Sequence, residues 1–383
     1  MKIKKILAVS LISTLLFSPI AALADTNTDT VVIADSAYQY LLSKGIASEK
    51  LDQLDLDILE STMRQAEANN FTNEQIQQYI DGQISIANTI TPHSNTENGV
   101  ISEDGSTITT SYGTVSNLLS RYTEQLTDEN AENGITTAAY SSSPTTVVNS
   151  SDQTGVYWAV KSGTGYTEAT SFITLPTISN YNSIDRPYLF LAANSTASGT
   201  CLTFIGDYGV VYNGGSWYPF VNASQWSDSL GAYQSIASYW PSTKITTTSL
   251  YLHIKITNGS STDTVYFEIL DGNNFSNVIY STTISFTGNP VNASASNLNL
   301  YHETTLAQVH STGTSLNTST GTLMTNAKFT NAYLYNSSTT SQWGTNQTSS
   351  AYRQAPTTTK LNCVTLNSYS MWHTDDVSIR FNQ

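Results

Sequence analysis

The sequence predicts a mostly β protein, an antiparallel sandwich or jelly roll that follows a small helical region. From residue 153 to residue 383, more than ten short runs alternate apolar and polar side chains, a pattern typical of strands with one buried face. Clusters of Gly, Asn, Ser and Asp separate these runs and predict tight turns. Helical periodicity is confined to the residues before 91. Together these patterns favour a sandwich domain over residues 153–383.

The first 24 residues have the three parts of a secretory signal. Lys2, Lys4 and Lys5 form a basic start, and an apolar run covers 6–16. The small-residue pattern Ala22-Leu23-Ala24 follows and predicts cleavage after Ala24. The apolar run is shorter than the ~20 residues that a transmembrane helix needs. We therefore expect a secreted, extracellular protein that does not span a membrane.

Residues 25–90 form a predicted acidic helical region. Gly45 follows the first apolar stretch and is typical of a helix end. The clearest start is at Thr72, because Gln75 three residues later completes a capping box, and Phe71 and Ile76 are placed for a hydrophobic staple. The apolar stripe of this region predicts either a core of its own or a surface that docks on the rest of the protein.

Residues 91–152 are rich in Thr, Ser and Asn and are interpreted as a linker with partial order. The best strand prediction in the sandwich region is 249–270. There SLYLHIKIT and TVYFEIL place their branched and aromatic side chains alternately on two faces, and NGSSTD between them is a turn cluster. This is the pattern of a β-hairpin.

Charge and cysteine content limit the partners and the compartment. The chain has 15 Lys and Arg against 29 Asp and Glu, a net charge of −14, and signal cleavage would remove three of the lysines. Such an acidic protein is not expected to bind nucleic acid, because phosphate binding needs a basic surface. The two cysteines, Cys201 and Cys363, favour a disulfide in an oxidising compartment, worth about 4–5 kcal/mol for so long a loop. The alternative is a pair of buried free thiols.

The middle of the chain resembles the eqolisin glutamic peptidases. The resemblance rests on PYLFLAANSTASGTCLTFIGDYGVVYNGGSWYPFV (187–221), on Tyr239-Trp240-Pro241, on the hairpin 249–270 and on TNAKFTNAYLY (325–335). It implies a concanavalin-A-like sandwich. It also implies a catalytic Gln at the position of Gly206 or Asp207 and a catalytic Glu at Lys328. Because neither position holds the required residue, the resemblance implies a scaffold without its catalytic pair.

The motif Trp217-Tyr218-Pro219-Phe220 also resembles a motif of the secreted YrpD-type proteins of Gram-positive bacteria, a group without an assigned activity. Around it lies a dense aromatic segment. Aromatic rings with polar neighbours suit the stacking of sugars and equally the binding of extended peptide, although sandwiches also bury many tyrosines. The candidate binding residues are Asp207, Tyr208, Tyr212, Trp217, Tyr218, Tyr239, Trp240 and Lys328.

Other chemistries have weak support in the sequence. Glu168, Glu268 and Glu303 are isolated in the sandwich region, and the alternation around Glu268 predicts an exposed face for its side chain. No His, Cys or acidic spacing matches a metal motif, and no phosphate loop or nucleophile elbow occurs. We therefore expect no metal and no cofactor.

The leading hypothesis from the sequence is a non-catalytic, secreted protein that binds a glycan or another extended cell-wall polymer. The second hypothesis is a divergent secreted hydrolase, a peptidase or a glycosidase. The third is a structural surface or matrix protein whose strands assemble between chains. The sequence leaves the oligomeric state open.

Overall fold

The structure is a computed structural model. It describes residues 37–52, parts of 59–70, residues 71–87, short segments between 93 and 116, residues 144–149, and 154–382 apart from 199–202, 229–231, 240–242, 309–315 and 371–373. The predicted signal peptide and its cleavage site after Ala24 lie outside the described residues, as do Cys201 and Trp240. None of the helices within the described part of the chain is long and apolar enough to cross a membrane.

The N-terminal helices pack around a small core of their own. A helical stretch at 37–43 is followed by α2 (Ser48–Leu51) and α4 (Asn73–Ala87). The predicted capping box is present, since the Gln75 side chain accepts a hydrogen bond from the Thr72 amide at 2.9 Å and the Thr72 hydroxyl accepts one from the Gln75 amide at 3.3 Å. Phe71 and Ile76 are both buried in the helical cluster. This cluster is separate from the core of the sandwich.

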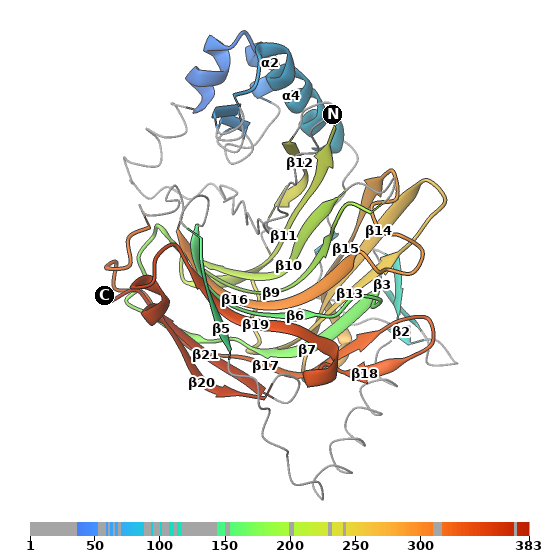
Figure 1. The fold of residues 1–383 in the computed structure, drawn as a ribbon, viewed down its shortest axis with the longest axis vertical. Helices are drawn as coiled ribbons and strands as arrows, with labels where there is room; N and C mark the ends of the chain where they lie inside the picture. Colours follow the sequence, from blue (N-terminus) through green and yellow to red (C-terminus); the bar gives the residue numbers. More distant parts are fainter. Residues whose placement is uncertain are drawn as a thin grey trace, which may run out of the picture.

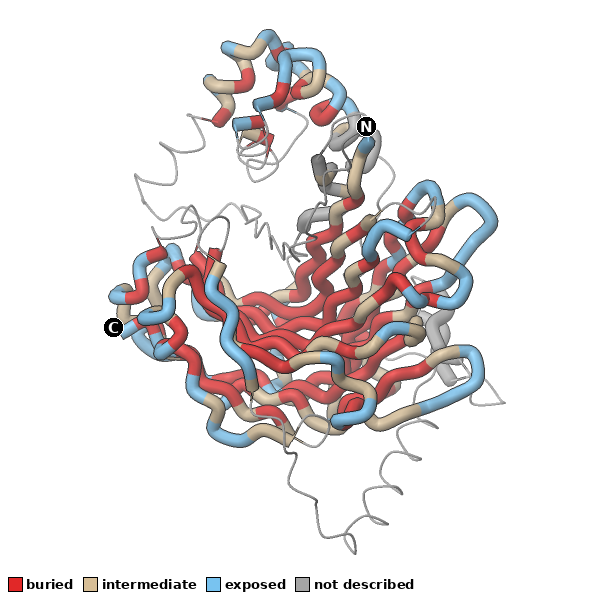
Figure 2. Tube along the Cα trace, viewed as in Figure 1, coloured by how far each residue is buried: buried red, intermediate tan, exposed pale blue. Residues whose placement is uncertain are grey.

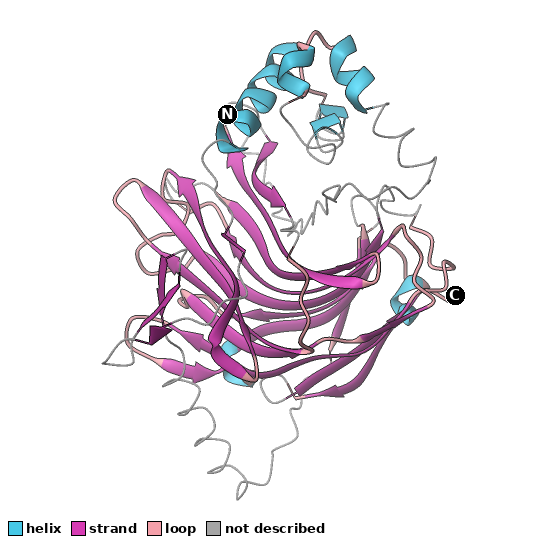
Figure 3. Ribbon diagram, turned by 180° about the vertical axis from the view of Figure 1, so that it is seen from behind, coloured by secondary structure: helices cyan, strands magenta, loops and turns pink. Residues whose placement is uncertain are grey.

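The sandwich consists of two large sheets that are antiparallel except at one edge. The strand order of the eight-stranded sheet is β12 (Ala232–Tyr239), β11 (Ser216–Ser227), β10 (Phe204–Asn213), β9 (Asp185–Ser195), β16 (Leu298–Gln308), β6 (Gly155–Ser162), β19 (Thr348–Ala355) and β5 (Thr145–Val148). Only β5 pairs in parallel, with β19. This sheet is strongly curved (Figures 1 and 3).

The second sheet has ten strands. Its main path is β1 (His93–Ser94), β15 (Asn274–Thr287), β14 (Thr262–Asp271), β13 (Ser249–Thr257), β7 (Glu168–Thr174), β17 (Leu323–Tyr335), β21 (Thr374–Arg380) and β20 (Val364–Tyr369). Two short strands, β8 (Thr177–Ser179) and β18 (Thr340–Gln342), also pair with β17. The predicted hairpin 249–270 is the β13–β14 pair. A separate three-stranded sheet contains β2 (Val100–Ile101), β3 (Thr107–Thr110) and β4 (Gly113–Ser116).

The main hydrophobic core lies between the two large sheets (Figure 2). On β13 the predicted alternation holds, because Leu250, Leu252, Ile254 and Ile256 all point into this core. Two 3₁₀ turns, η2 (Thr345–Gln347) and η3 (Lys360–Cys363), lie in the connections next to β19 and β20. The fold class predicted from the sequence is thus confirmed as a mostly β, two-sheet antiparallel sandwich preceded by a small helical region.

The structure changes two expectations about single residues. Cys363 is a free, buried thiol rather than half of a disulfide. It ends η3 inside the main core, where burial raises the pKa of its thiol. Glu268 does not lie on an exposed face but is fully buried on β14, because the outer side of the ten-stranded sheet carries a hydrogen-bonded polar network of its own.

Candidate functional site

The outer face of the eight-stranded sheet, turned away from the ten-stranded sheet, holds the candidate site. On β9, Leu189 and Leu191 point into the main core, whereas Tyr188 and Phe190 belong to a second buried cluster. Residues that pair directly across strands share a face. The sheet register therefore places Asp207 of β10 and Glu303 of β16 on the outer face. In the view of Figure 1 the sheet curves around this face.

Two neighbouring rows of paired residues cross this face. The first row runs from Asn222 through Asp207, Ala192 and Tyr301 to Lys161. The second row contains Phe220, Gly209, Phe190, Glu303, Ala159 and Tyr352. Asp207 and Glu303 thus flank β9 on either side. The two acids are separated by two strand spacings of about 4.8 Å and by two residues along the strands, so their Cα atoms lie about 12 Å apart.

Both carboxyl groups are buried without hydrogen-bond partners. Asp207 and Glu303 are each only 1% exposed, and none of their carboxyl oxygens has a partner among the described residues. Oxygens of Asn194, Asn222 and Thr305, on the same face, also lack partners. Buried polar groups are almost always hydrogen-bonded, and those that are not mark strain, catalysis or a missing ligand. Five such groups on one face of one sheet indicate a functional surface.

The environment keeps both acids protonated over a wide pH range. Burial raises the pKa of Asp207 to about 8, and the side chain of Asn222 opposes this shift. Burial also raises the pKa of Glu303 well above its ordinary value, and the negative charge of Asp207 raises it further. The two groups therefore titrate as an interacting pair, in which a negative charge on Asp207 disfavours ionisation of Glu303. Strongly shifted carboxyl groups of this kind are typical of acid–base catalytic sites.

Aromatic rings surround the pair. Tyr188 and Phe190 both pack edge-on against Phe220, with ring centroids 4.9 and 5.6 Å apart. Tyr352 lies in the row of Glu303, and burial, reinforced by the charge of Glu303, raises the pKa of its phenol. Tyr301 lies in the row of Asp207, beside Lys161. The cluster is closed to solvent in this structure.

Gly209 is required by the close packing of this face. A Cβ atom at this position would lie 2.2 Å from the carbonyl oxygen of Leu189 and 2.5 Å from the Cβ of Phe190. Glycine lets the neighbouring backbone and the Phe190 side chain come this close, as in other strands where a second chain segment approaches. The packing fixes Phe190 between the two acids.

The ten-stranded sheet carries a different polar cluster on its own outer face. His253 Nδ1 lies 2.7 Å from Glu268 Oε1, and its Nε2 lies 3.0 Å from Glu168 Oε1. The Tyr266 hydroxyl donates to Glu268 at 2.8 Å. Burial alone would lower the pKa of His253, but the hydrogen bonds to both glutamates raise it to about 9. His253 is thus an imidazolium with a partner on each nitrogen, which indicates a structural role.

A second buried histidine lies inside the sandwich. His302 packs against Phe329 and Trp343, with ring centroids 4.8 and 4.9 Å away. Its Nε2 is 3.5 Å from Asp375, which accepts a hydrogen bond from the Trp158 indole at 3.2 Å. Burial lowers the pKa of His302 to about 3, so the ring is neutral. Both histidines are fully buried. Within the described residues no group of three His, Cys, Asp or Glu side chains could hold a metal ion.

The residues predicted from the sequence divide between several places. Asp207 and Tyr218 lie on or beside the outer face of the eight-stranded sheet. Tyr208 and Trp217 are buried in the main core, and Tyr212 packs against it, so these three rings do not form an open sugar platform. Tyr239 ends β12, and its side chain is outside the described structure.

Lys328 does not lie opposite Asp207. It is on β17 of the other sheet and pairs with Asp376 at 3.2 Å. Lys328 and Asp207 thus lie on different sheets, so these two aligned positions do not face each other across one site.

Glu303 is a candidate site residue that sequence reasoning missed. Its neighbours in NLYHETTLAQ (299–308) gave a signal, because it is the one acid of this run and buried strands seldom hold an acid. The sequence could not show that this acid shares a face with Asp207, because the two residues lie 96 positions apart and meet only through β9.

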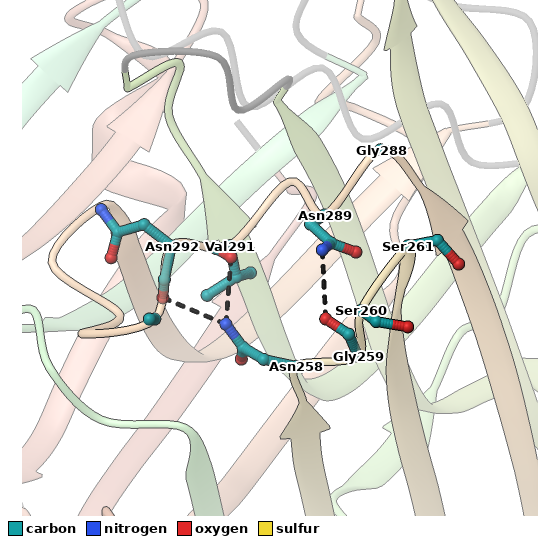
Figure 4. Close-up of a pocket in the computed structure, with 9 residues that line it drawn as sticks. Asn258, Gly259, Ser260, Ser261, Gly288, Asn289, Val291 and Asn292 are labelled. Atoms are coloured by element: carbon teal, nitrogen blue, oxygen red, sulfur yellow. Dashed lines mark hydrogen bonds between the residues drawn. The ribbon is translucent and has the colours of Figure 1, made fainter.

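A separate, open pocket lies at one end of the sandwich (Figure 4). Its volume is about 610 Å³, and its lining comes from the β13–β14 turn and from the loop after β15. The Asn258 amide donates to the carbonyls of Val291 and Asn292 at 3.0 and 3.1 Å, and the Asn289 amide donates to the Gly259 carbonyl at 3.1 Å. These bonds connect the two loops, and the lining has no charged residue.

Comparison with known proteins gives a likeness in fold. No protein-family model matches the chain, and no curated protein sequence matches it. The chain is similar to scytalido-glutamic peptidase bound to a peptide-based transition-state analogue, with a TM-score of 0.35 and 12% identity over 59% of this chain and 98% of that one. It is also similar to SCP-B, an eqolisin peptidase in complex with the tripeptide Ala-Ile-His, with a TM-score of 0.31 and 11% identity over 59% of this chain and 98% of that chain.

A further similarity is to the CBM2 module of the evolved Dit protein of Lactobacillus casei BL23 phage J-1, with a TM-score of 0.18 and 12% identity over 44% of this chain and 76% of the module. At these identities the likeness concerns the sandwich architecture.

Proposed function

We propose that the protein is a secreted hydrolase that cleaves extended polypeptide on the outer face of the eight-stranded sheet. The observation that carries the proposal is the pair of buried, unpartnered carboxyl groups of Asp207 and Glu303. Keeping two such groups inside a protein is costly, and pairs of acids with raised pKa values are a recurrent device for acid–base catalysis at a single bond. Export is expected from the predicted signal peptide.

The roles of the two acids follow from their environments. In this mechanism Asp207 is the acid that ionises, so its carboxylate acts as the general base and takes a proton from water while the water oxygen bonds to the peptide carbonyl carbon. Glu303 remains protonated and gives its proton to the amide nitrogen as the C–N bond breaks. One new carboxylic acid and one new amine result. Exchange of a proton between the two side chains through solvent restores the starting state.

Substrate reaches the pair only when the outer face opens, because Asp207 and Glu303 are closed to solvent here. The assay therefore uses the full chain, both intact and nicked by limited proteolysis, with a peptide library from pH 3 to pH 9 and mass-spectrometric detection of products. We expect cleavage by the wild type and its loss in Asp207→Asn and Glu303→Gln. The matched control is Asp81→Asn, on the exposed side of α4, which should cleave like the wild type. Equal cleavage by Glu303→Gln and the wild type would refute the proposal.

A non-catalytic role is the second candidate, namely binding of a glycan or another extended cell-wall polymer. It is favoured by the tyrosines of the outer face, Tyr188, Tyr301 and Tyr352, because aromatic rings next to polar groups bind both sugars and peptides. A glycan array with the full chain distinguishes the two candidates. Tight glycan binding that survives in Glu303→Gln, without peptide cleavage by the wild type, would favour the binding role.

A further inference from the structure

Lys161 is a basic residue of the candidate site. It belongs to the row that contains Asp207, where it lies between Tyr301 of β16 and Ser350 of β19. Its ammonium group lies 5.6 Å from the centre of the Tyr301 ring, a distance at which a cation is attracted to the ring face. The side chain is half-buried, and burial lowers its pKa.

No described acid neutralises this lysine. Two other lysines of the sandwich have carboxylate partners, since Lys255 lies 3.7 Å from Glu168 and Lys328 lies 3.2 Å from Asp376. Lys161 has no ion pair among the described residues, in a chain with nearly twice as many acids as bases. A half-buried positive charge without an anionic partner is unfavourable unless a ligand supplies the negative charge.

The position of Lys161 sets a distance from the reacting bond. Lys161 is on the strand next to Glu303 and is displaced from it by two residues along the sheet. Strand spacing and residue rise place the two Cα atoms about 8 Å apart. An extended peptide advances about 3.3 Å per residue, so an anionic side chain two or three residues from the cleaved bond would reach the ammonium group.

The centre of the face offers apolar contacts to a bound peptide. Phe190, Phe220, Val211 and Ala192 have no polar side-chain atoms, and they lie between and beside the two acids. An apolar amino-acid side chain against such a surface loses no hydrogen bonds. The unpartnered oxygens of Asn194 and Asn222 can accept hydrogen bonds from peptide N–H groups.

We infer that the site selects polypeptides that carry an Asp or Glu two or three residues from the cleaved bond, and that Lys161 binds this acidic side chain. The inference rests on the proposed function. Lys161 acts in it as a residue that determines specificity, while Asp207 and Glu303 perform the chemistry.

The test compares matched peptides that differ only in Glu or Gln at that position, with the full chain nicked by limited proteolysis. For the wild type we expect a kcat/KM ratio of about tenfold in favour of the Glu peptide, the value of one charge-assisted contact. In Lys161→Gln the ratio should fall to about one, and in Lys161→Glu a Lys peptide should become the better substrate. Lys50→Gln removes the same charge from α2 and should keep the wild-type ratio.

Two outcomes separate the inference from the proposed function. If the wild type cleaves both peptides equally, the Lys161 inference is wrong while the hydrolase proposal stands. If the wild type cleaves neither peptide, the hydrolase proposal fails, and binding of the same two peptides to Glu303→Gln by calorimetry decides the inference. The inference is supported if Glu303→Gln binds the Glu peptide more tightly and the double variant with Lys161→Gln loses this preference. Equal binding of the two peptides to Glu303→Gln overturns the inference.

Discussion

The protonated state of Asp207 makes a quantitative prediction about stability and pH. Burial raises the pKa of Asp207 from its ordinary value of 3.8 to about 8, so the unfolded chain releases the proton at a lower pH than the folded protein. The protonated Asp207 side chain contributes its full stabilisation when the pH is below the pKa that Asp207 has in the unfolded chain. This stabilisation is lost as the pH rises toward the pKa that Asp207 has in the folded protein. The slope is about 1.4 kcal/mol per pH unit for one group.

Between pH 5 and pH 7, ionisation of Asp207 in the unfolded chain should therefore lower the free energy of unfolding by about 3 kcal/mol. Asp207→Asn keeps the shape of the side chain but removes this proton. Urea unfolding at both pH values, followed by tryptophan fluorescence, measures the difference for the wild type and the variant. Over this interval the free energy of unfolding of Asp207→Asn should fall by about 3 kcal/mol less than that of the wild type, whereas that of Asp81→Asn should follow the wild type.

The measurement refutes the reasoning if the wild type and Asp207→Asn show the same change between pH 5 and pH 7. That result would mean that the Asp207 carboxyl ionises in the folded protein at an ordinary pKa, and that its environment is not the dry, unpartnered one described above. Glu303→Gln is the companion variant, and it should flatten the pH dependence in the same direction because the pKa of Glu303 is also raised.

Three further predictions concern the rest of the sandwich. His253→Gln leaves Glu168 and Glu268 buried without their shared cation. This should lower the free energy of unfolding, measured in urea at pH 7, by about 3–5 kcal/mol. Because the pKa of His253 is raised to about 9, the wild type should lose this stabilisation as pH rises through 9. Gly209→Ala should destabilise the protein by about 1–3 kcal/mol through overpacking against Phe190, measured by the shift of the urea midpoint, and an unchanged midpoint would contradict the close contact. Cys363 should react with a thiol reagent in urea but not in the native protein, and rapid native labelling would show that the thiol is not buried.

The fold was predictable from the sequence because its strongest patterns are local. Alternation in 249–270 gave the β13–β14 hairpin with its inward face, and the Thr72–Gln75 box gave the start of α4. Both depend on residues close together in the chain. Trp217 and Tyr208 were predicted as binding residues, whereas the structure buries both in the main core. The alternation that defines a strand does not tell which of its two faces is covered.

The site was only half predictable for the same reason. Asp207 was singled out, but its partner Glu303 comes from a strand 96 residues later, and the two are brought to the same face by the order β10-β9-β16. Glu168 and Glu268 were expected to be solvated, yet they meet through His253. In each case the decisive fact is strand order in a sheet of mostly non-local pairs, which periodicity does not encode.

The pH–rate profile of peptide cleavage tests the central claim most directly, because that claim needs one ionised and one protonated acid in the same site. For the wild type, kcat/KM should rise as Asp207 ionises and fall as Glu303 loses its proton, which gives a bell-shaped curve. Asp207→Asn and Glu303→Gln should each abolish cleavage. Cleavage by either variant at the wild-type rate, or a wild-type rate that does not change between pH 3 and pH 9, would contradict the assignment of Asp207 and Glu303 as the hydrolytic pair.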